Sequence, residues 1–330
     1  MLRFSYFPGC TLTGSAREYD LATRSVAGAL DIELLELADW NCCGGVTAAS
    51  LSERALNVLG RRNLEQVPQE APELLCPCPH CYTSFARTLA SAGQNAAEMG
   101  VNLRNILDVF AGGEVLERLV ERRTEPLTDL RLAGYYGCKL SRPDPEVASH
   151  RSERGSSAGF GESAGALERV IEACGATAVE WPAGADCCGA ALGVASGDAA
   201  EELLAAIYQA VLGAGAEAIV VACPLCHLNL DLHQYQVSQR LGSRVDVPVF
   251  FITELMAVAL GIEECEDWLE RHVTSPLPMF MRFIEAQEER EYWGEEGPPG
   301  EATGEEPVPA AAASEEVGAG GSQESERPGL

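Results

Sequence analysis

The sequence predicts an α/β protein made of two repeated α/β units, each with a mostly parallel sheet. Apolar runs of strand length alternate with segments of helical periodicity, a pattern typical of parallel sheets with right-handed crossovers. In addition, Cys-Cys-Gly occurs at 42–44 and again at 187–189, and 34 residues after each glycine comes a Cys-Pro-x-Cys. We therefore divide the chain into a first unit at 1–128, a second unit at 129–285 and a tail at 286–330.

The first unit begins with a short apolar run that leads to Cys10, and a segment with one polar face follows it. In chain order we expect a strand at Phe4–Phe7, a helix at Ser15–Leu30, a strand at Ile32–Leu37, a helix capped by Thr47 and ending near Leu59, and a buried strand at Glu73–Leu75. The last of these strands delivers Cys78.

The second unit repeats this order. We expect a strand at Leu132–Tyr136, a helix at Leu167–Cys174, a strand at Ala178–Trp181, a helix at Ala199–Ala214 and a strand at Ala218–Val221. The polar, glycine-rich segment Ser141–Glu162 predicts a surface loop.

Ten cysteines belong to the repeat, because a Gly-Cys pair at Gly9-Cys10 and at Gly137-Cys138 precedes each doublet. Each follows the carboxyl end of a predicted strand, where open α/β sheets bind ligands. Gly44 and Gly189 would let the backbone approach a bulky ligand and begin the next helix. The first cysteine group is Cys10, Cys42, Cys43, Cys78 and Cys81, and the second cysteine group is Cys138, Cys187, Cys188, Cys223 and Cys226.

Five thiolates per group are too many for a tetrahedral zinc site and one more than an ordinary four-cysteine iron–sulfur cluster needs. A vicinal pair can place two sulfurs on neighbouring metals, which indicates an unusual cluster. A disulfide scaffold suits a small secreted chain, whereas this one has 330 residues and can bury ordinary cores.

With these motifs the chain resembles the cysteine-rich CCG-domain family, whose best-known member is the catalytic B subunit of heterodisulfide reductase. The resemblance runs from about Leu2 to about Pro278, through both complete motifs and the segment Pro248-Val-Phe-Phe-Ile-Thr-Glu-Leu. It implies that each cysteine group holds one non-cubane four-iron four-sulfur cluster, and that the two clusters face each other across the interface between the halves.

The resemblance further implies that a disulfide is reduced to two thiols between the clusters. The sequence has neither a ferredoxin-type cysteine run nor a Gly-x-Gly-x-x-Gly at a strand-to-helix turn, so electrons must come from a partner chain. By resemblance the partners are a ferredoxin-like iron–sulfur C subunit and a flavin-containing A subunit. Two alternatives stay open: an electron-transfer subunit of a quinone-linked dehydrogenase, and a zinc-stabilised interaction module.

Beside the cysteines, three residues are candidate catalytic groups. His80 and His227 lie within or next to the Cys-Pro-x-Cys segments and could bond to a cluster sulfur or deliver a proton to a thiolate, or serve the structure alone. Lys139 follows Cys138 and could pair with a substrate carboxylate or phosphate, with a cluster charge, or with solvent; Arg142 shares these interpretations.

Three further cysteines lie outside the repeat. They are expected to be buried in the core: Cys76, Cys174 and Cys265.

The net charge is −27, and 13 acidic and two basic residues lie from Glu285 onward. This balance excludes a nucleic-acid binder, which needs clustered Lys and Arg. The segment Gly294–Leu330 has no aromatic residue and predicts a disordered acidic tail.

Cys10 comes too early for a removable signal, and the longest apolar stretch, Val247–Gly261, contains Thr253 and Glu254 and is shorter than the roughly 20 residues that span a bilayer. We expect a cytoplasmic protein with no direct membrane insertion.

Overall fold

The computed structural model describes residues 1–93, 99–124, 126–142, 165–192 and 196–293, with side chains up to residue 285. In the first half the elements are β1 (Leu2–Tyr6), α1 (Gly9–Leu12), α2 (Arg17–Ala29), β2 (Ile32–Glu36), α3 (Thr47–Leu51), α4 (Glu53–Leu64), β3 (Glu73–Cys76), α5 (Pro79–Ala92), β4 (Asn102–Asn105), α7 (Ile106–Phe110) and α8 (Gly113–Arg122).

In the second half the elements are β5 (Arg131–Tyr135), α9 (Gly137–Ser141), α12 (Ala166–Ala173), β6 (Thr177–Ala178), α13 (Gly197–Gly213), β7 (Ala218–Val221), α14 (Pro224–Leu232), α15 (Gln234–Leu241), β8 (Val249–Phe251), α16 (Ile252–Ala259), α17 (Cys265–Leu269) and α18 (Leu277–Trp293). Most of the predicted loop Ser141–Glu162 and the predicted tail from Gly294 lie outside the described residues.

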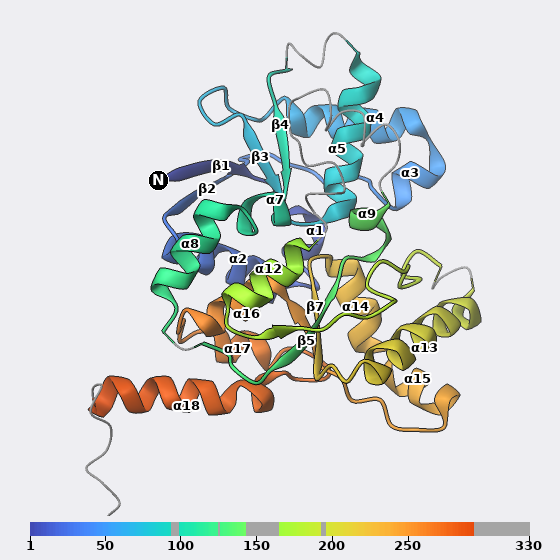
Figure 1. Ribbon diagram of the computed structural model, residues 1–330. Helices are drawn as coiled ribbons and strands as arrows, with labels where there is room; N and C mark the ends of the chain where they lie inside the picture. Colours follow the sequence, from blue (N-terminus) through green and yellow to red (C-terminus); the bar gives the residue numbers. More distant parts are fainter. Residues whose placement is uncertain (94–98, 125, 143–164, 193–195, 294–330) are drawn as a thin grey trace, which may run out of the picture.

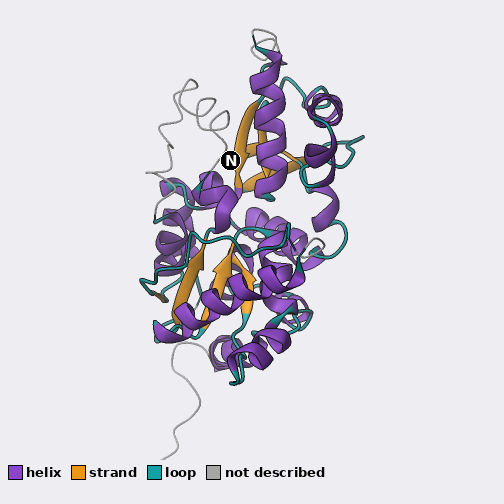
Figure 2. Cartoon of the chain, turned by 90° about the vertical axis from the view of Figure 1, so that its right-hand side faces the viewer, coloured by secondary structure: helices purple, strands orange, loops and turns teal. Residues whose placement is uncertain are grey.

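The described strands form two four-stranded sheets of one topology. Their orders are β2-β1-β3-β4 and β6-β5-β7-β8, and all paired strands are parallel. Figure 1 shows the first sheet above the second, and Figure 2 shows the strands of each sheet side by side. This repeated arrangement confirms the predicted fold class.

Two predicted elements differ in extent from the observed ones. The helix expected from Thr47 to about Leu59 is broken at Ser52, whose extended backbone ends α3 and whose hydroxyl oxygen accepts a hydrogen bond from Ala55 N at the start of α4. The strand expected at Ala178–Trp181 is shorter, because Trp181 turns aside and its Nε1 donates to Gly134 O at 3.0 Å.

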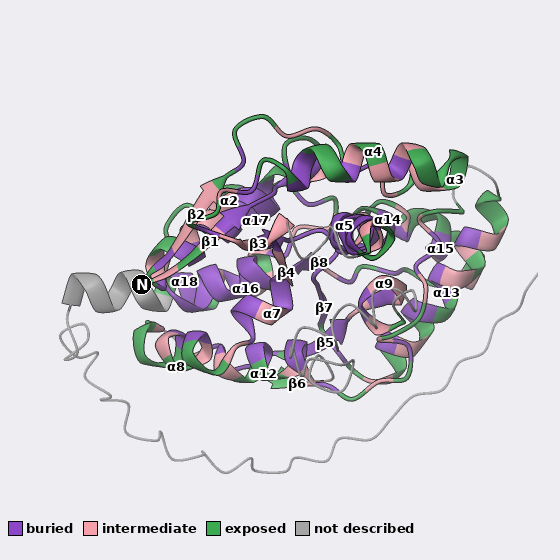
Figure 3. Ribbon diagram, turned by 90° about the horizontal axis from the view of Figure 1, so that it is seen from above, coloured by how far each residue is buried: buried purple, intermediate pink, exposed green. Residues whose placement is uncertain are grey.

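The two halves interlock through a layer of helices. Helix α2 of the first half packs on α16 and α17 of the second, and α12 of the second half packs on α7 and α8 of the first. One hydrophobic core accordingly contains side chains from both halves, such as Tyr19 and Phe251, while a second core lies under α5 in the first half. In Figure 3 the interlocking α16 is mostly buried, whereas α3, α4 and α13 expose their outer faces.

One close helix contact in the first half depends on Gly60. Helices α4 and α5 pack where Gly60 meets Thr88, and a Cβ added to this glycine would lie 2.2 Å from Thr88 Oγ1. Thr88 is held in place because its hydroxyl donates to Ser84 O at 3.0 Å. We therefore expect Gly60→Ala to lower the free energy of unfolding by about 1–3 kcal/mol, the usual cost of overpacking, as measured by urea denaturation.

The matched control is Gly28→Ala in α2. No atom lies within 4 Å of a Cβ added at this exposed position. Alanine should leave the free energy of unfolding unchanged or raise it by up to about 1 kcal/mol, since it restricts the unfolded chain. Equal losses in the two variants would contradict the role given to the Gly60–Thr88 contact.

Candidate metal centres at the cysteine groups

The first cysteine group lies at the carboxyl edge of the first sheet. Cys10 is in α1, Cys42 and Cys43 follow β2, and Cys78 and Cys81 stand at the start of α5. The Sγ atoms of Cys10 and Cys42 are 3.6 Å apart, and those of Cys43 and Cys81 are 3.1 Å apart. Side-chain hydrogen bonds also join Cys42 to Cys43 and Cys78 to Cys81. The five thiols therefore form one connected group.

The second cysteine group repeats this arrangement. Cys138 is in α9, Cys187 and Cys188 precede α13, and Cys223 and Cys226 stand at the start of α14. The Sγ atoms of Cys188 and Cys226 are 3.5 Å apart. Side-chain hydrogen bonds also join Cys138 to Cys187 and Cys223 to Cys226. The structure thus brings together all five thiols in each half.

Each group has a buried side and an accessible side. Three thiols of the first group and three of the second are buried: Cys43, Cys78, Cys81, Cys188, Cys223 and Cys226. Cys10 and Cys42 are exposed, and their counterparts Cys138 and Cys187 are half-buried. A small molecule or a partner can therefore reach equivalent sulfurs in both halves.

Two glycines let the backbone run beside the buried sulfurs. Gly9 and Gly137, with φ of 72° and 62°, adopt the left-handed conformation that favours glycine. A Cβ on Gly9 would lie 3.1 Å from Cys81 Sγ, and one on Gly137 would lie 2.8 Å from Cys226 Sγ. The space that a side chain would fill is thus kept for sulfur and its ligand.

Gly44 and Gly189, the predicted cofactor-binding glycines, also have positive φ, at 72° and 79°. The backbone N–H of each donates to the first sulfur of its doublet at 3.4 Å, that of Cys42 or of Cys187. A Cβ on either glycine would collide with the following helical segment rather than with a sulfur, for example with Ala48 Cβ at 2.7 Å. Close packing therefore accounts for these glycines at least as much as approach to a ligand.

In both groups the electrostatics favour one buried thiolate. Hydrogen bonding with Cys42 and with Cys81 lowers the pKa of Cys43 to about 3, whereas the bond between Cys43 and Cys81 raises the pKa of Cys81 well above its ordinary value. The hydrogen bond between Cys188 and Cys226 likewise lowers the pKa of Cys188 and raises that of Cys226. Crowded thiols that compete for protons are suited to a metal cation, which deprotonates its sulfur ligands.

The N-termini of two helices also stabilise negative charge on the sulfurs. Cys78 is the N-cap of α5 and Cys223 the N-cap of α14, and Pro79 and Pro224 occupy the first helical turns. The partial positive charge of a helix N-terminus therefore lies beside two sulfurs in each half, which stabilises negative charge there.

The two cysteine groups face each other across the interface between the halves. Helix α1 packs on α14, and α5 packs on α9, so the cysteine-bearing helices pair crosswise. Tyr19 of α2 lies between them: its hydroxyl donates to Ala222 O at 3.2 Å, and its ring stacks on Phe251 at 4.0 Å. Burial, together with the thiols of Cys223 and Cys78, raises the pKa of Tyr19.

The three candidate catalytic residues are placed differently. His80 is half-buried in the first turn of α5, and Lys139 is half-buried in α9 next to Cys138. His227 is buried, and its Nε2 lies 2.9 Å from Val249 O and 2.7 Å from His272 Nδ1. The hydrogen-bond partners of His227 Nε2 are thus a backbone oxygen and a second histidine, and not a cysteine sulfur.

The remaining cysteines are buried, as expected of core residues: Cys76, Cys174 and Cys265. Cys76 packs in one buried cluster with Cys43, Cys78 and Cys81, and this burial raises the pKa of its thiol, with smaller contributions from Cys43 and Cys78.

Sequence reasoning missed two residues that hold the second doublet. Asn229 Nδ2 donates to Cys188 O at 2.6 Å, and the Tyr135 hydroxyl donates to Asp186 O at 2.7 Å. Asn229 lies three residues after Cys226 on α14, and this i, i+3 spacing could have indicated that both face the doublet.

In the part of the chain that the structure describes, no helix combines the length and the apolar character needed to cross a membrane. A solved structure of a hypothetical protein from Helicobacter pylori is similar in fold, with a TM-score of 0.59 at 11% identity. The similarity covers 83% of this chain and 52% of that one.

Two curated relatives align over most of the chain. The 8-methylmenaquinol:fumarate reductase membrane anchor subunit of Wolinella succinogenes is 28% identical over 82% of this chain and 96% of its own length. The B subunit of the ferredoxin/F420H2-dependent CoB-CoM heterodisulfide reductase of Methanosarcina acetivorans is 28% identical over 86% of this chain and 98% of its own length.

The family comparison covers both halves separately. The model of the cysteine-rich CCG domain matches residues 4–86 and 133–231, which include all ten cysteines of the two groups. The chain belongs to the CCG cysteine-rich domain family.

Proposed function

We propose that this protein is the catalytic iron–sulfur subunit of a heterodisulfide reductase-like complex, and that it reduces a disulfide to two thiols. The observation that supports this most is the presence of two equivalent five-thiol groups that face each other across one interface. In this proposal each group holds one non-cubane four-iron four-sulfur cluster. Family membership and the relatives named as B subunits of heterodisulfide reductases support an oxidoreductase role.

The residues present fit such a cluster. Five thiols converge in each half, and the backbone at Gly9 and Gly137 leaves room beside the buried sulfurs. When bound, two clusters would supply one-electron transfer and an iron acceptor for each sulfur of a disulfide. The more accessible sulfurs, such as Cys10 and Cys138, mark the side from which a substrate would enter. In this proposal Lys139, in α9 directly after Cys138, binds a substrate carboxylate or phosphate there.

The electrons would come from a ferredoxin-like iron–sulfur C subunit, itself supplied by a flavin-containing A subunit. The relative from Methanosarcina acetivorans is named as one subunit of a reductase, which supports assembly with other chains. The sequence itself contains no ferredoxin-type cysteine run.

The first test of this proposal is metal content. Two four-iron clusters require about eight irons and eight sulfides per chain, whereas a zinc-stabilised interaction module requires about two zincs. We expect anaerobically purified or reconstituted protein to contain about eight irons and about eight sulfides per chain, as measured by iron and acid-labile sulfide analysis. Stable zinc in the thiol groups without iron–sulfur absorption would contradict the proposal and favour the interaction module.

A second candidate function is electron transfer in a quinone-linked dehydrogenase, without binding of a disulfide. The relative from Wolinella succinogenes, named as a subunit of a fumarate reductase, favours it, because its name refers to no disulfide. Both candidates require the same clusters, so metal content does not separate them. Variants that disable one cysteine group at a time do separate the two candidates.

A further inference from the structure

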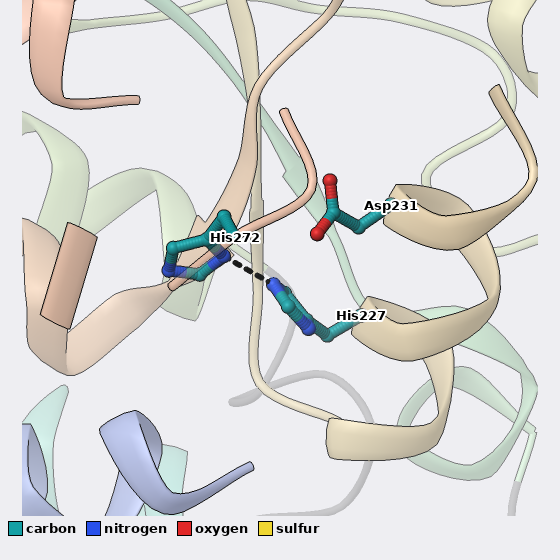
Figure 4. A group of neighbouring side chains, drawn as sticks. All are labelled: His227, Asp231 and His272. Carbon is teal, nitrogen blue, oxygen red and sulfur yellow. Dashed lines mark hydrogen bonds between the residues drawn. The ribbon is translucent and has the colours of Figure 1, made fainter. Parts of the chain in front are cut away.

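A cluster of buried polar side chains lies beside the second cysteine group. His227 and Asp231 are one helical turn apart on α14, and His272 comes from the segment between α17 and α18. All three are buried, and one possible ligand atom from each lies within 4.8 Å of the other two. Figure 4 shows the His227 and His272 rings in contact, with the Asp231 carboxylate above them.

The protons in this cluster can be assigned from its contacts. Val249 O can only accept a hydrogen bond, so His227 Nε2, 2.9 Å away, carries a hydrogen. His272 Nδ1 lies 2.7 Å from the same Nε2 and therefore presents a lone pair to it. A hydrogen on both nitrogens would set two N–H groups against each other. His272 Nε2 carries a hydrogen, which it donates to Glu254 Oε1 at 2.9 Å.

Both His272 and Asp231 are oriented by outer hydrogen bonds. Glu254 holds the His272 ring with Nδ1 pointing into the cluster, and its other oxygen accepts from Phe251 N at 2.8 Å. The Asp231 carboxylate accepts from Val273 N at 2.7 Å and Thr274 N at 2.9 Å. A carboxylate behind a histidine, and backbone donors behind an aspartate, are the supports that metal ligands commonly have.

The charge balance of the cluster also suits a cation. Three carboxyl groups are buried together: those of Glu18, Asp231 and Glu254. A buried carboxylate is costly unless an opposite charge or hydrogen-bond donors compensate it. A divalent cation bound by Asp231 and backed by Glu254 would balance two of these charges.

The repeat does not explain these residues. His227 directly follows the second cysteine of its Cys-Pro-x-Cys, and Tyr82 occupies that position in the first half. The counterpart of Asp231 in the first half is Ala86. Since the first cysteine group has the same geometry without them, assembly of a cysteine group does not require a histidine and an aspartate at these positions. They serve a purpose specific to the second half.

We propose that His227, Asp231 and His272 bind one divalent transition-metal ion of the zinc type, separate from the cysteine groups. Two imidazoles and one carboxylate suit zinc, and Val249 O or a water can complete the tetrahedron. His227 and His272 contribute Nε2 and Nδ1, and His227 then carries its proton on Nδ1. A surface pocket of about 620 Å³ is lined by Asp231, Val273 and Thr274, so one of the three proposed ligands borders open space. The ion fastens the segment around His272 to α14.

The test uses the full chain with its iron–sulfur content intact. After incubation with zinc and removal of the excess, we expect one zinc per chain that is retained in addition to the iron. Zinc-edge X-ray absorption should show nitrogen and oxygen at about 2.0–2.1 Å and no sulfur at about 2.3 Å. Asp231→Asn and His272→Gln should lose this zinc at unchanged iron content. His233→Ala, a nearby half-buried histidine outside the cluster, is the matched control and should keep it.

If either ligand variant fails to fold, Glu254→Gln provides a milder change that keeps the size of the side chain. Loss of the carboxylate behind His272 should weaken zinc binding by about 10- to 100-fold, as measured by competition with a chromophoric chelator, while the iron content stays constant. The proposal is overturned if the wild-type chain retains no zinc, if sulfur dominates the zinc spectrum, or if Asp231→Asn binds zinc as tightly as the wild type.

Discussion

Replacing Cys188 by alanine should abolish disulfide reduction while the first cysteine group keeps its iron. Cys43→Ala should also abolish disulfide reduction, but here the second cysteine group keeps its iron. Both residues provide buried sulfurs: Cys188 Sγ lies 3.5 Å from Cys226 Sγ, and Cys43 Sγ lies 3.1 Å from Cys81 Sγ. Loss of either sulfur therefore disrupts one cysteine group and leaves the other intact. A disulfide held between two clusters needs an acceptor for each of its sulfurs. We therefore expect a rate loss of at least about 100-fold, or about 2.7 kcal/mol in activation free energy, and iron content reduced by half.

The assay uses reduced viologen as electron donor with the isolated chain and a panel of thiol disulfides. Cys174→Ala is the matched control, because Cys174 is a buried cysteine outside both groups, and its loss should change neither the iron content nor the rate. If single-group variants reduce disulfides as fast as the intact protein, disulfide binding between two clusters is wrong. Electron transfer in a quinone-linked dehydrogenase then becomes the better explanation.

Gly137→Ala should remove the iron of the second cysteine group without removing a sulfur. At φ of 62° an alanine costs about 1–2 kcal/mol in backbone energy, and its Cβ would lie 2.8 Å from Cys226 Sγ. Either the backbone or Cys226 must move, and Cys226 is hydrogen-bonded to Cys188 and Cys223. We expect about half of the iron to be lost, as measured by iron analysis and electron paramagnetic resonance of the reduced protein.

Gly213→Ala, at the end of α13, is the control for this change. No atom lies within 4 Å of a Cβ added at Gly213, so the variant should keep all its iron. Full iron content in Gly137→Ala would show that the backbone there does not limit the space beside Cys226, and the role we assign to Gly9 and Gly137 would be wrong.

Two edge strands escaped prediction, for opposite reasons. β4 consists of Asn102–Asn105, which contains no apolar run, and it is a strand because it pairs with β3. β8, at Val249–Phe251, was hidden in the apolar stretch Val247–Gly261, which in fact holds a buried strand followed by α16. Periodicity cannot divide a continuous apolar run between a strand and a helix.

The packing between the halves could not be predicted either. The sequence shows a repeat, and a repeat alone suggests two units placed end to end. In the structure α2 packs on α16 and α12 packs on α7, so each half covers a helix of the other. Tyr19, between the two cysteine groups, belongs to this shared layer, and its contacts reach to Ala222 and Phe251, more than 200 residues along the chain.

The sequence by itself determined the fold class, the internal repeat and the ten cysteines that form two groups. These follow from local patterns, because alternating strands and helices bring every strand end, and the cysteines beyond it, to one edge of a sheet. That the groups face each other was expected only from the family resemblance, and the packing of α1 on α14 and of α5 on α9 agrees with it. The tertiary structure alone decided that His272 and Glu254 join His227 in one buried cluster. Contacts of this kind depend on how whole helices pack, and no local pattern of residues encodes them.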